Sequence, residues 1–333
     1  MTFDVVGIGN ALVDIEVRVE EDFVKSLGVV KGGMTLSTIE DQQRILDAVR
    51  DHAHKISSGG SAANTIHGIG AMGGKGYYLG RVADDDYGQH YTDDMRDCGV
   101  GFPGPDAANA GTGTCVVLVT PDSERTMFTH LGISSELHPD NVDEAIVDGA
   151  GAVYIEGYLW TGDETRNAAI KMADAAREAG VPVAFTLSDG FIVNAFREAL
   201  IDFIRWKVDI LFCNDVEARA MAGTQDTEAA FEQLRGMVDT LFLTRGKQGA
   251  LACNAANDHV EIGSFPVQAV DTTGAGDLFA GGALFGLTRK LPLKQCGILG
   301  SYCAGQVVSY MGARLPKSAV LTVNEILNRY PGP

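Results

Sequence analysis

The second half of the chain repeats one pattern, in which a short apolar run precedes a longer segment with apolar residues at helical spacing. Runs at 152–156, 182–187 and 210–213 are each followed by such a segment. Short continuous apolar runs are typical of strands buried on both faces, and strands that alternate with helices form parallel sheets covered on both sides. The pattern therefore predicts an α/β fold with three layers around a mainly parallel central sheet.

The first half contains strands of a different kind. Residues 12–20 alternate apolar and polar side chains, and residues 32–37 resemble them. This alternation indicates strands with one face in water, which do not fit inside a parallel sheet covered on both faces. We therefore expect a single domain over residues 1–333, with a small β-sheet lid formed by residues 12–37 and 101–120.

Charge and cysteine content narrow the classes of partner. The formal net charge is -18, and so acidic a chain repels nucleic acids and anionic membranes. The six cysteines form no C-x-x-C pair, which favours buried free thiols in a reducing compartment. No apolar stretch is long enough to span a bilayer, and the first residues do not resemble a signal peptide. These features predict a cytoplasmic protein that binds a small molecule.

The segment that carries the clearest chemistry lies between Asp271 and Asp277. Between the two aspartates stand Thr272, Thr273 and three small residues, Gly274, Ala275 and Gly276. Small residues at a helix start let backbone N–H groups point into a cavity, and the helix dipole adds positive potential there. This is an anion hole suited to a phosphoryl group, and Asp277 on the first turn could accept the proton of an attacking hydroxyl. The alternative is a glycine-rich turn capped by an aspartate.

Two segments near the N-terminus have residues suited to a polyol. Gly59 and Gly60 precede a predicted helix that carries Asn64, and Asn10 and Asp14 follow the first predicted strand. Glycines allow a ligand to approach the backbone closely, and carboxylate and amide groups can bind vicinal hydroxyls. Open α/β sheets bind ligands at the carboxyl ends of their strands. A plain helix start and a solvated turn are the alternatives.

Two further segments suit a nucleotide. Asn214 and Glu217 follow the strand at 210–213, where a carboxylate could hold Mg²⁺ through water, although a helix-capping box predicts the same residues. Thr244 and Gly246 lie in a turn after another strand and could contact a phosphate or ribose. A bare β-turn explains this second pair equally well.

Together these motifs resemble those of the ribokinase-like (PfkB) carbohydrate kinase family along the whole chain. The glycine pair, the Asn-x-x-Glu segment at 214–217 and the segment at 271–282 occur in the family's order. The details resemble its bacterial adenosine kinase-like members, at residues 7–14, 32–36, 124–127, 157–160 and 187–189.

The resemblance implies an ATP-dependent kinase that phosphorylates the 5′-hydroxyl of a nucleoside, adenosine giving AMP. Asp277 would be the base, beside an anion hole at Gly274, Ala275 and Gly276. The residues implied to hold the ribose are Asn10, Asp14, Gly59, Gly60 and Asn64. Those implied at Mg²⁺–ATP are Asn214, Glu217, Thr244 and Gly246, with Mg²⁺ held through water near Glu217. The resemblance also implies a K⁺ site at Asp271 and Thr273, with the loop at Gly312 opposite.

Several alternatives stay open. The acceptor could instead be ribose, fructose or a related sugar, and a non-catalytic nucleotide or sugar sensor would keep the same fold. A dehydrogenase is disfavoured because the first strand leads into no G-x-G-x-x-G segment. Arg125 could serve the site or be a surface charge, and both a monomer and a homodimer fit the sequence. The candidates for a purine slot are Phe128, Leu131, Tyr158 and Trp160, and a place in the apolar core explains these four residues equally well.

Overall fold

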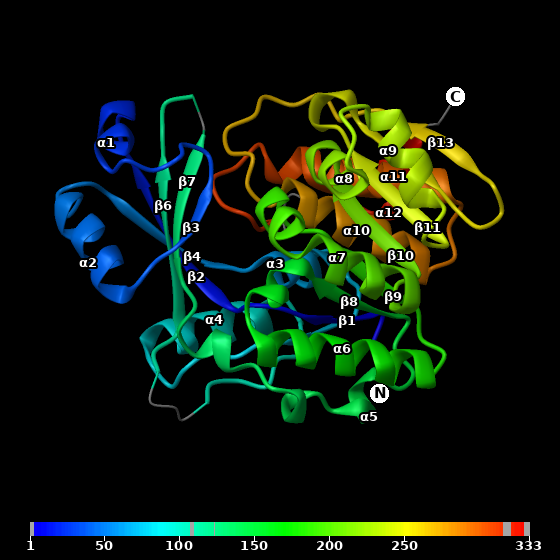
Figure 1. Cartoon of the computed structure of the whole chain (residues 1–333), viewed down its shortest axis with the longest axis horizontal. Coiled ribbons are helices and arrows are strands. Elements are labelled where there is room, and N and C mark those ends of the chain that lie inside the picture. The colour runs from blue at the N-terminus through cyan, green and yellow to red at the C-terminus, as the bar shows by residue number, and fades with distance from the viewer. Residues whose placement is uncertain (1–2, 107–109, 123, 316–320, 330–333) are drawn as a thin grey trace.

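The computed structural model describes residues 3–106, 110–122, 124–315 and 321–329. Residues 107–109 of the expected lid range lie outside the described residues, as does Ser123 in the turn that follows it. A large layered body carries a smaller sheet beside one end, drawn at the left of Figure 1 with helices α1 and α2.

The central sheet of the described chain has eight strands in the order β13-β12-β11-β10-β9-β8-β1-β5. Pairing is parallel from β5 to β11, whereas β12 and β13 are antiparallel, so the predicted mainly parallel sheet is confirmed. The strands are β1 (Val5–Ile8), β5 (Gly76–Leu79), β8 (Ala152–Glu156), β9 (Val183–Thr186), β10 (Ile210–Asn214), β11 (Thr240–Thr244), β12 (Ala250–Cys253) and β13 (His259–Ile262).

Helices cover both faces of this sheet because alternate residues of each strand point to opposite sides. In β9, Phe185 belongs to one apolar core and Ala184 to the other. The helices against the first core are α5 (Glu144–Val147), α6 (Asp163–Glu178), α7 (Gly190–Lys207), α8 (Asp215–Ala222) and α9 (Thr227–Arg235). Those against the second core are α3 (Ser61–Ala71), α4 (Asp86–Asp97), α10 (Ala275–Thr288), α11 (Leu293–Val307) and α12 (Val323–Arg329).

The second sheet has five strands among the described residues, in the order β3-β7-β6-β2-β4. Its strands are β2 (Leu12–Arg18), β3 (Met34–Leu36), β4 (His54–Gly59), β6 (Gly113–Val119) and β7 (Arg125–His130). Only β2, β3 and β6 fall within the expected ranges. Strands β4 and β7 lie outside those ranges but also belong to the sheet, because β4 pairs with β2 and β7 pairs with β6.

The two faces of the lid have different partners. Val116 and Leu118 of β6 pack against helices α1 (Glu21–Ser26) and α2 (Ile39–Ala48). Cys115 and Val117, the alternate residues of the same strand, point away from those helices. The lid is thus a two-layer unit whose second face is not covered by these helices. No helix in the described ranges has the length and apolar run that a membrane span needs.

Candidate active site

A cavity of about 520 Å³ lies between the lid and the carboxyl ends of the parallel strands. Asn10 follows β1, whereas Glu156, Asn214 and Thr244 end β8, β10 and β11, and all four line the cavity. Parallel strands bring their carboxyl ends to one edge, which is where open α/β sheets bind ligands. The volume falls within the usual range for small-molecule sites.

The Asp277 carboxylate lies at the floor of this cavity, on the first turn of α10. Ser61 Oγ donates to one carboxylate oxygen at 2.7 Å, and Asn64 Nδ2 donates to the other at 2.9 Å. Burial raises the pKa of Asp277 to about 6, although these two hydrogen bonds favour the charged form. A carboxylate with this pKa is ionised at neutral pH yet close enough to it to exchange a proton.

The predicted anion hole lies beside this carboxylate. Gly274 is the N-cap of α10 with φ 72°, and Ala275 and Gly276 follow on its first turn and line the cavity with it. First-turn N–H groups of a helix lack carbonyl partners within the helix and carry positive potential. A Cβ at Gly274 would lie 2.6 Å from the carbonyl oxygen of Ala313, so the tight turn requires glycine.

The glycine pair brings two predicted binding segments together. Gly60 has φ 94°, and a Cβ there would lie 2.1 Å from the carbonyl oxygen of Asn10. A Cβ at Gly59 would lie 2.6 Å from the carboxylate oxygens of Asp14. Asn10, Asp14, Gly60 and Asn64 line the cavity, whereas Gly59 lies behind Asp14 and does not. Burial raises the pKa of Asp14 to about 7, although the charge of Arg125 opposes the shift.

Glu156 was missed in the sequence, although it ends a buried strand at the same sheet edge as Asn214. Its carboxylate accepts hydrogen bonds from the backbone N–H groups of Asn10 and Ala62, both at 2.7 Å. It therefore joins the segment after β1 to the start of α3. Burial raises the pKa of Glu156 to about 7 against the effect of these donors.

Glu156→Gln should lower the free energy of unfolding by about 1–3 kcal/mol, because one backbone N–H then faces an NH₂ group instead of an acceptor. Urea unfolding at about pH 5, where folded Glu156 is protonated and still presents an oxygen to each N–H, measures the loss. The difference should shrink as the pH rises through about 7, because burial penalises the ionised carboxylate in the folded state whereas glutamine stays neutral. Glu198→Gln, at a side chain that is 86% exposed, is the matched control. Equal stability of both variants and the parent at about pH 5 would show that Glu156 does not hold the two segments.

Arg314 was also missed, and no local signal in the sequence marks it. Its Nε donates to Asn64 Oδ1 at 3.3 Å, and its Nη1 pairs with Asp94. With Oδ1 held in this way, the Nδ2 of Asn64 faces Asp277. Arg314 thus fixes the orientation of an amide that contacts the predicted base.

The Asn214–Glu217 pair forms a capping box and also lines the cavity. Asn214 Nδ2 and its backbone N donate to the two oxygens of Glu217 at 2.7 and 3.0 Å, and Glu217 N donates to Asn214 Oδ1 at 2.8 Å. Each carboxylate oxygen keeps lone pairs toward the cavity, which fits a Mg²⁺ ion held through water. Burial raises the pKa of Glu217 to about 7.

Of the two other residues predicted to contact the nucleotide, only one lines the cavity. Thr244 lines the cavity, and its Oγ1 lies 3.4 Å from the carbonyl oxygen of Cys213. Gly246, with φ 54°, is not among the lining residues.

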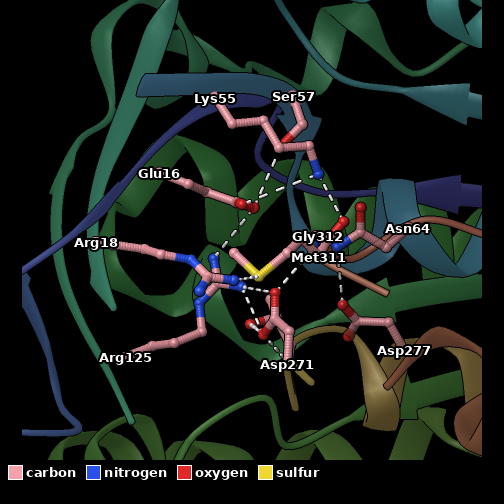
Figure 2. A network of polar contacts seen from close by, with 11 residues as sticks. Glu16, Arg18, Lys55, Ser57, Asn64, Arg125, Asp271, Asp277, Met311 and Gly312 are labelled. Atoms are coloured by element: carbon pink, nitrogen blue, oxygen red, sulfur yellow. Dashed lines mark hydrogen bonds and ion pairs between the residues drawn. The ribbon is translucent and has the colours of Figure 1, made fainter. Parts of the chain in front are cut away.

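The three residues implied at a K⁺ site do come together, but they are already paired. Asp271 accepts hydrogen bonds from Arg125 Nη1 and from the backbone N of Gly312 (Figure 2). It also accepts from the backbone N and Oγ1 of Thr273. A cation needs oxygen ligands with free lone pairs, whereas the groups that face this carboxylate are donors and one is a cation. These contacts do not fit a K⁺ ion bound to this carboxylate.

Two residues proposed for a purine slot lie elsewhere. Phe128 packs in the core between the lid and its helices, because the pleat turns alternate residues of β7 to opposite faces. Trp160 lies in the core of the main body against Phe185 and Phe203. Leu131 and Tyr158 do line the cavity. The other apolar lining residues on the lid are Leu12, Met34, Leu36, Cys115 and Met127.

This chain is similar to known proteins along nearly its whole length. Adenosine kinase from Sinorhizobium meliloti superposes with a TM-score of 0.91 at 36% identity, covering 98% of this chain and 99% of that one. A probable sugar kinase protein from Rhizobium etli CFN 42 gives 0.92 at 34% identity, covering 99% and 98%. Adenosine kinase from Saccharomyces cerevisiae is 25% identical over 96% of this chain and 99% of its own length.

The family model described as pfkB family carbohydrate kinase matches residues 29–319, which include the Asp271–Asp277 segment and every described strand except β1 and β2. This chain belongs to the pfkB family of carbohydrate kinases.

Proposed function

We propose that this protein is an ATP-dependent nucleoside kinase that phosphorylates the 5′-hydroxyl of adenosine and releases AMP. The observation that carries the proposal is the position of Asp277, which shares one cavity with a helix N-terminus, with the carboxylate of Asp14 and with an apolar lid face. The S. meliloti and S. cerevisiae relatives, both named adenosine kinase, support the choice of acceptor.

In the proposed reaction the 5′-oxygen attacks the γ-phosphorus in line with the departing β,γ-bridging oxygen. Asp277 takes the proton of the 5′-hydroxyl as the new P–O bond forms, and ADP leaves with the electron pair of the broken bond. The first-turn N–H groups at Gly274, Ala275 and Gly276 stabilise charge on the transferred phosphoryl group. Mg²⁺, when held through water near Glu217, would neutralise charge on the nucleotide phosphates.

The acceptor's ribose would lie between the side chain of Asp14 and the first turn of α3. Asp14 can accept hydrogen bonds from two vicinal hydroxyls, and Asn64 can both donate and accept. The base would lie against the apolar lid face, where Leu36 is 47% exposed. An apolar surface of this kind at the mouth of a cavity suits an aromatic ring, and a free sugar would leave it uncovered.

A sugar kinase is the second candidate, since the R. etli relative is named a probable sugar kinase. A coupled assay of ADP release with Mg–ATP should compare adenosine, inosine, guanosine, ribose and fructose in parallel. We expect adenosine to give a kcat/KM at least about 100-fold above that of ribose, because a bound base contributes several kcal/mol of contacts. Faster turnover of ribose or fructose would make the protein a sugar kinase with the same base.

The proposal also predicts how the rate of phosphoryl transfer depends on pH. The rate should fall about tenfold per pH unit below about pH 6, because protonated Asp277 cannot accept the hydroxyl proton. The sign follows from the raised pKa, since the carboxylate is lost as the pH falls through 6 rather than through its usual value. The measurement is kcat at saturating substrates, with recovery after return to neutral pH to exclude unfolding. A kcat that stays flat down to about pH 4.5 would contradict this role for Asp277.

A further inference from the structure

A charge cluster with three buried members and one half-exposed member, Lys55, joins the lid to the loop that leads into the anion hole. It consists of Arg125 on β7, Glu16 on β2, Lys55 on β4 and Asp271 ahead of α10 (Figure 2). The side chains of Arg125, Glu16 and Asp271 are 6%, 2% and 0% exposed. Charges this deeply buried are tolerated only when they are paired.

The central contact of the cluster is between Arg125 and Asp271. Arg125 Nη1 lies 2.9 Å from one carboxylate oxygen of Asp271 and 2.8 Å from the other. The two residues are 146 positions apart, and Arg125 is the lid's contribution to the pair. Burial opposes ionisation of Asp271, but the charge of Arg125 and the hydrogen bonds from Gly312 and Thr273 hold its pKa below the usual value.

Asp271 in turn orders the two loops that shape the anion hole. Its Oδ1 accepts from the N and Oγ1 of Thr273 at 3.0 and 2.8 Å, immediately before Gly274. Its Oδ2 accepts from Gly312 N at 2.7 Å, in the loop whose Ala313 packs against Gly274. A carboxylate has about four lone-pair positions, and these contacts use them.

The rest of the cluster links Arg125 to the loop at Gly312. Arg125 Nη2 lies 3.6 Å from Glu16 Oε1, and Lys55 Nζ lies 4.0 Å from Glu16 Oε2. Lys55 also donates to the carbonyl oxygen of Met311 at 2.6 Å, next to Gly312. The donors from Arg125, Thr273 and Gly312 already occupy the oxygens of Asp271 that a metal cation would need as ligands.

We propose that the guanidinium of Arg125 takes the place of a metal cation beside the anion hole. When the lid covers the cavity, its guanidinium reaches Asp271 at the position where the family's K⁺ would lie, and it positions the loops on both sides of Gly274. Phosphoryl transfer in this protein accordingly requires Arg125 and does not require K⁺. The inference rests on the family's phosphoryl transfer and not on the identity of the acceptor.

The first arm of the test uses the parent protein. Its kcat should differ by less than about twofold between K⁺ and tetramethylammonium at equal ionic strength, with whichever acceptor of the panel is turned over. Its melting temperature should likewise be the same in both salts, because no cation binds the folded state selectively. An activation by K⁺ of about tenfold or more, or a melting temperature raised by K⁺ alone, would overturn the proposal.

The second arm removes the guanidinium. Arg125→Met should lower kcat by about 100-fold or more with a much smaller change in KM, since Arg125 positions the hole rather than the acceptor. Arg125→Lys keeps the positive charge but replaces the planar guanidinium, which has several donors, with a single ammonium group. This variant should therefore recover part of the kcat that Arg125→Met loses. Arg44→Met, on α2 of the lid at a side chain 77% exposed, is the matched control and should keep the parental kcat.

A third arm separates positioning from a general loss of structure. The losses of kcat caused by Arg125→Met and by Asp271→Asn should not add up when both changes are combined. The kcat of the double variant should lie within about threefold of the kcat of the slower single variant. In Arg125→Met, K⁺ can occupy the place that the guanidinium leaves, and a gain in kcat with K⁺ in that variant alone would support the proposal. Additive losses in the double variant, or an Arg125→Met enzyme within about threefold of the parent, would overturn it.

Discussion

Asp277→Asn is expected to lower kcat by roughly 10³-fold while KM for the acceptor changes little. Asparagine has the same shape and can still bind the side chains of Ser61 and Asn64, but it cannot accept a proton. The local geometry is preserved, because the amide oxygen can take one of the two hydrogen bonds that the carboxylate accepts. The loss should therefore appear in the chemical step.

Single-turnover kinetics with saturating substrates measures that step directly. Asp22→Asn is the matched control, since it makes the same chemical change at a side chain that is 94% exposed. The control should keep the parental rate. If Asp277→Asn turns over within about tenfold of the parent, another group takes the proton and the assignment of the base is wrong.

Gly274→Ala is expected to lower kcat by about 10²- to 10³-fold, the usual effect of removing a donor from an oxyanion site. Two costs act at this position. The backbone has φ 72°, where an L residue is strained by about 1–2 kcal/mol. The new methyl group would also lie 2.6 Å from the carbonyl oxygen of Ala313, so the turn must shift and move the N–H groups that follow.

Gly180→Ala separates the two costs. Gly180 has φ 69° but no atom within 4 Å of an added Cβ, and it lies outside the cavity lining. This control should lose about 1 kcal/mol of stability and no activity. Denaturant unfolding and kcat should be measured on both variants. Full activity of Gly274→Ala would show that the geometry of this turn does not govern phosphoryl transfer.

The architecture of the main body could be predicted because it follows from local patterns. Short apolar runs alternating with helical segments predict a parallel sheet, and parallel strands bring their carboxyl ends together. This reasoning predicts that Asn10, Asn214 and Thr244 lie at one edge of the sheet, where the structure places them. The same logic applied to Glu156, which ends β8, would have found it as well.

The long-range side-chain contacts could not be predicted in this way. Arg125 of the lid contacts Asp271 over 146 residues, and Arg314 contacts Asn64 of α3 over 250. Such pairs depend on how distant segments pack together, and no sequence periodicity indicates that packing. The pleat of β7 also decides which residues face the cavity, and it turns Phe128, one of the candidates for the purine slot, toward the core of the lid.

Adenosine and 5′-deoxyadenosine, assayed side by side for ADP release with Mg–ATP, test the central claim most directly. The two ligands share the base and both ribose hydroxyls that would face Asp14, and they differ only in the hydroxyl that Asp277 would deprotonate. We predict rapid ADP release with adenosine, none above background with 5′-deoxyadenosine, and competitive inhibition of the first by the second. Equal ADP release with both ligands, or none with adenosine while ribose is turned over, would contradict the proposed nucleoside 5′-kinase.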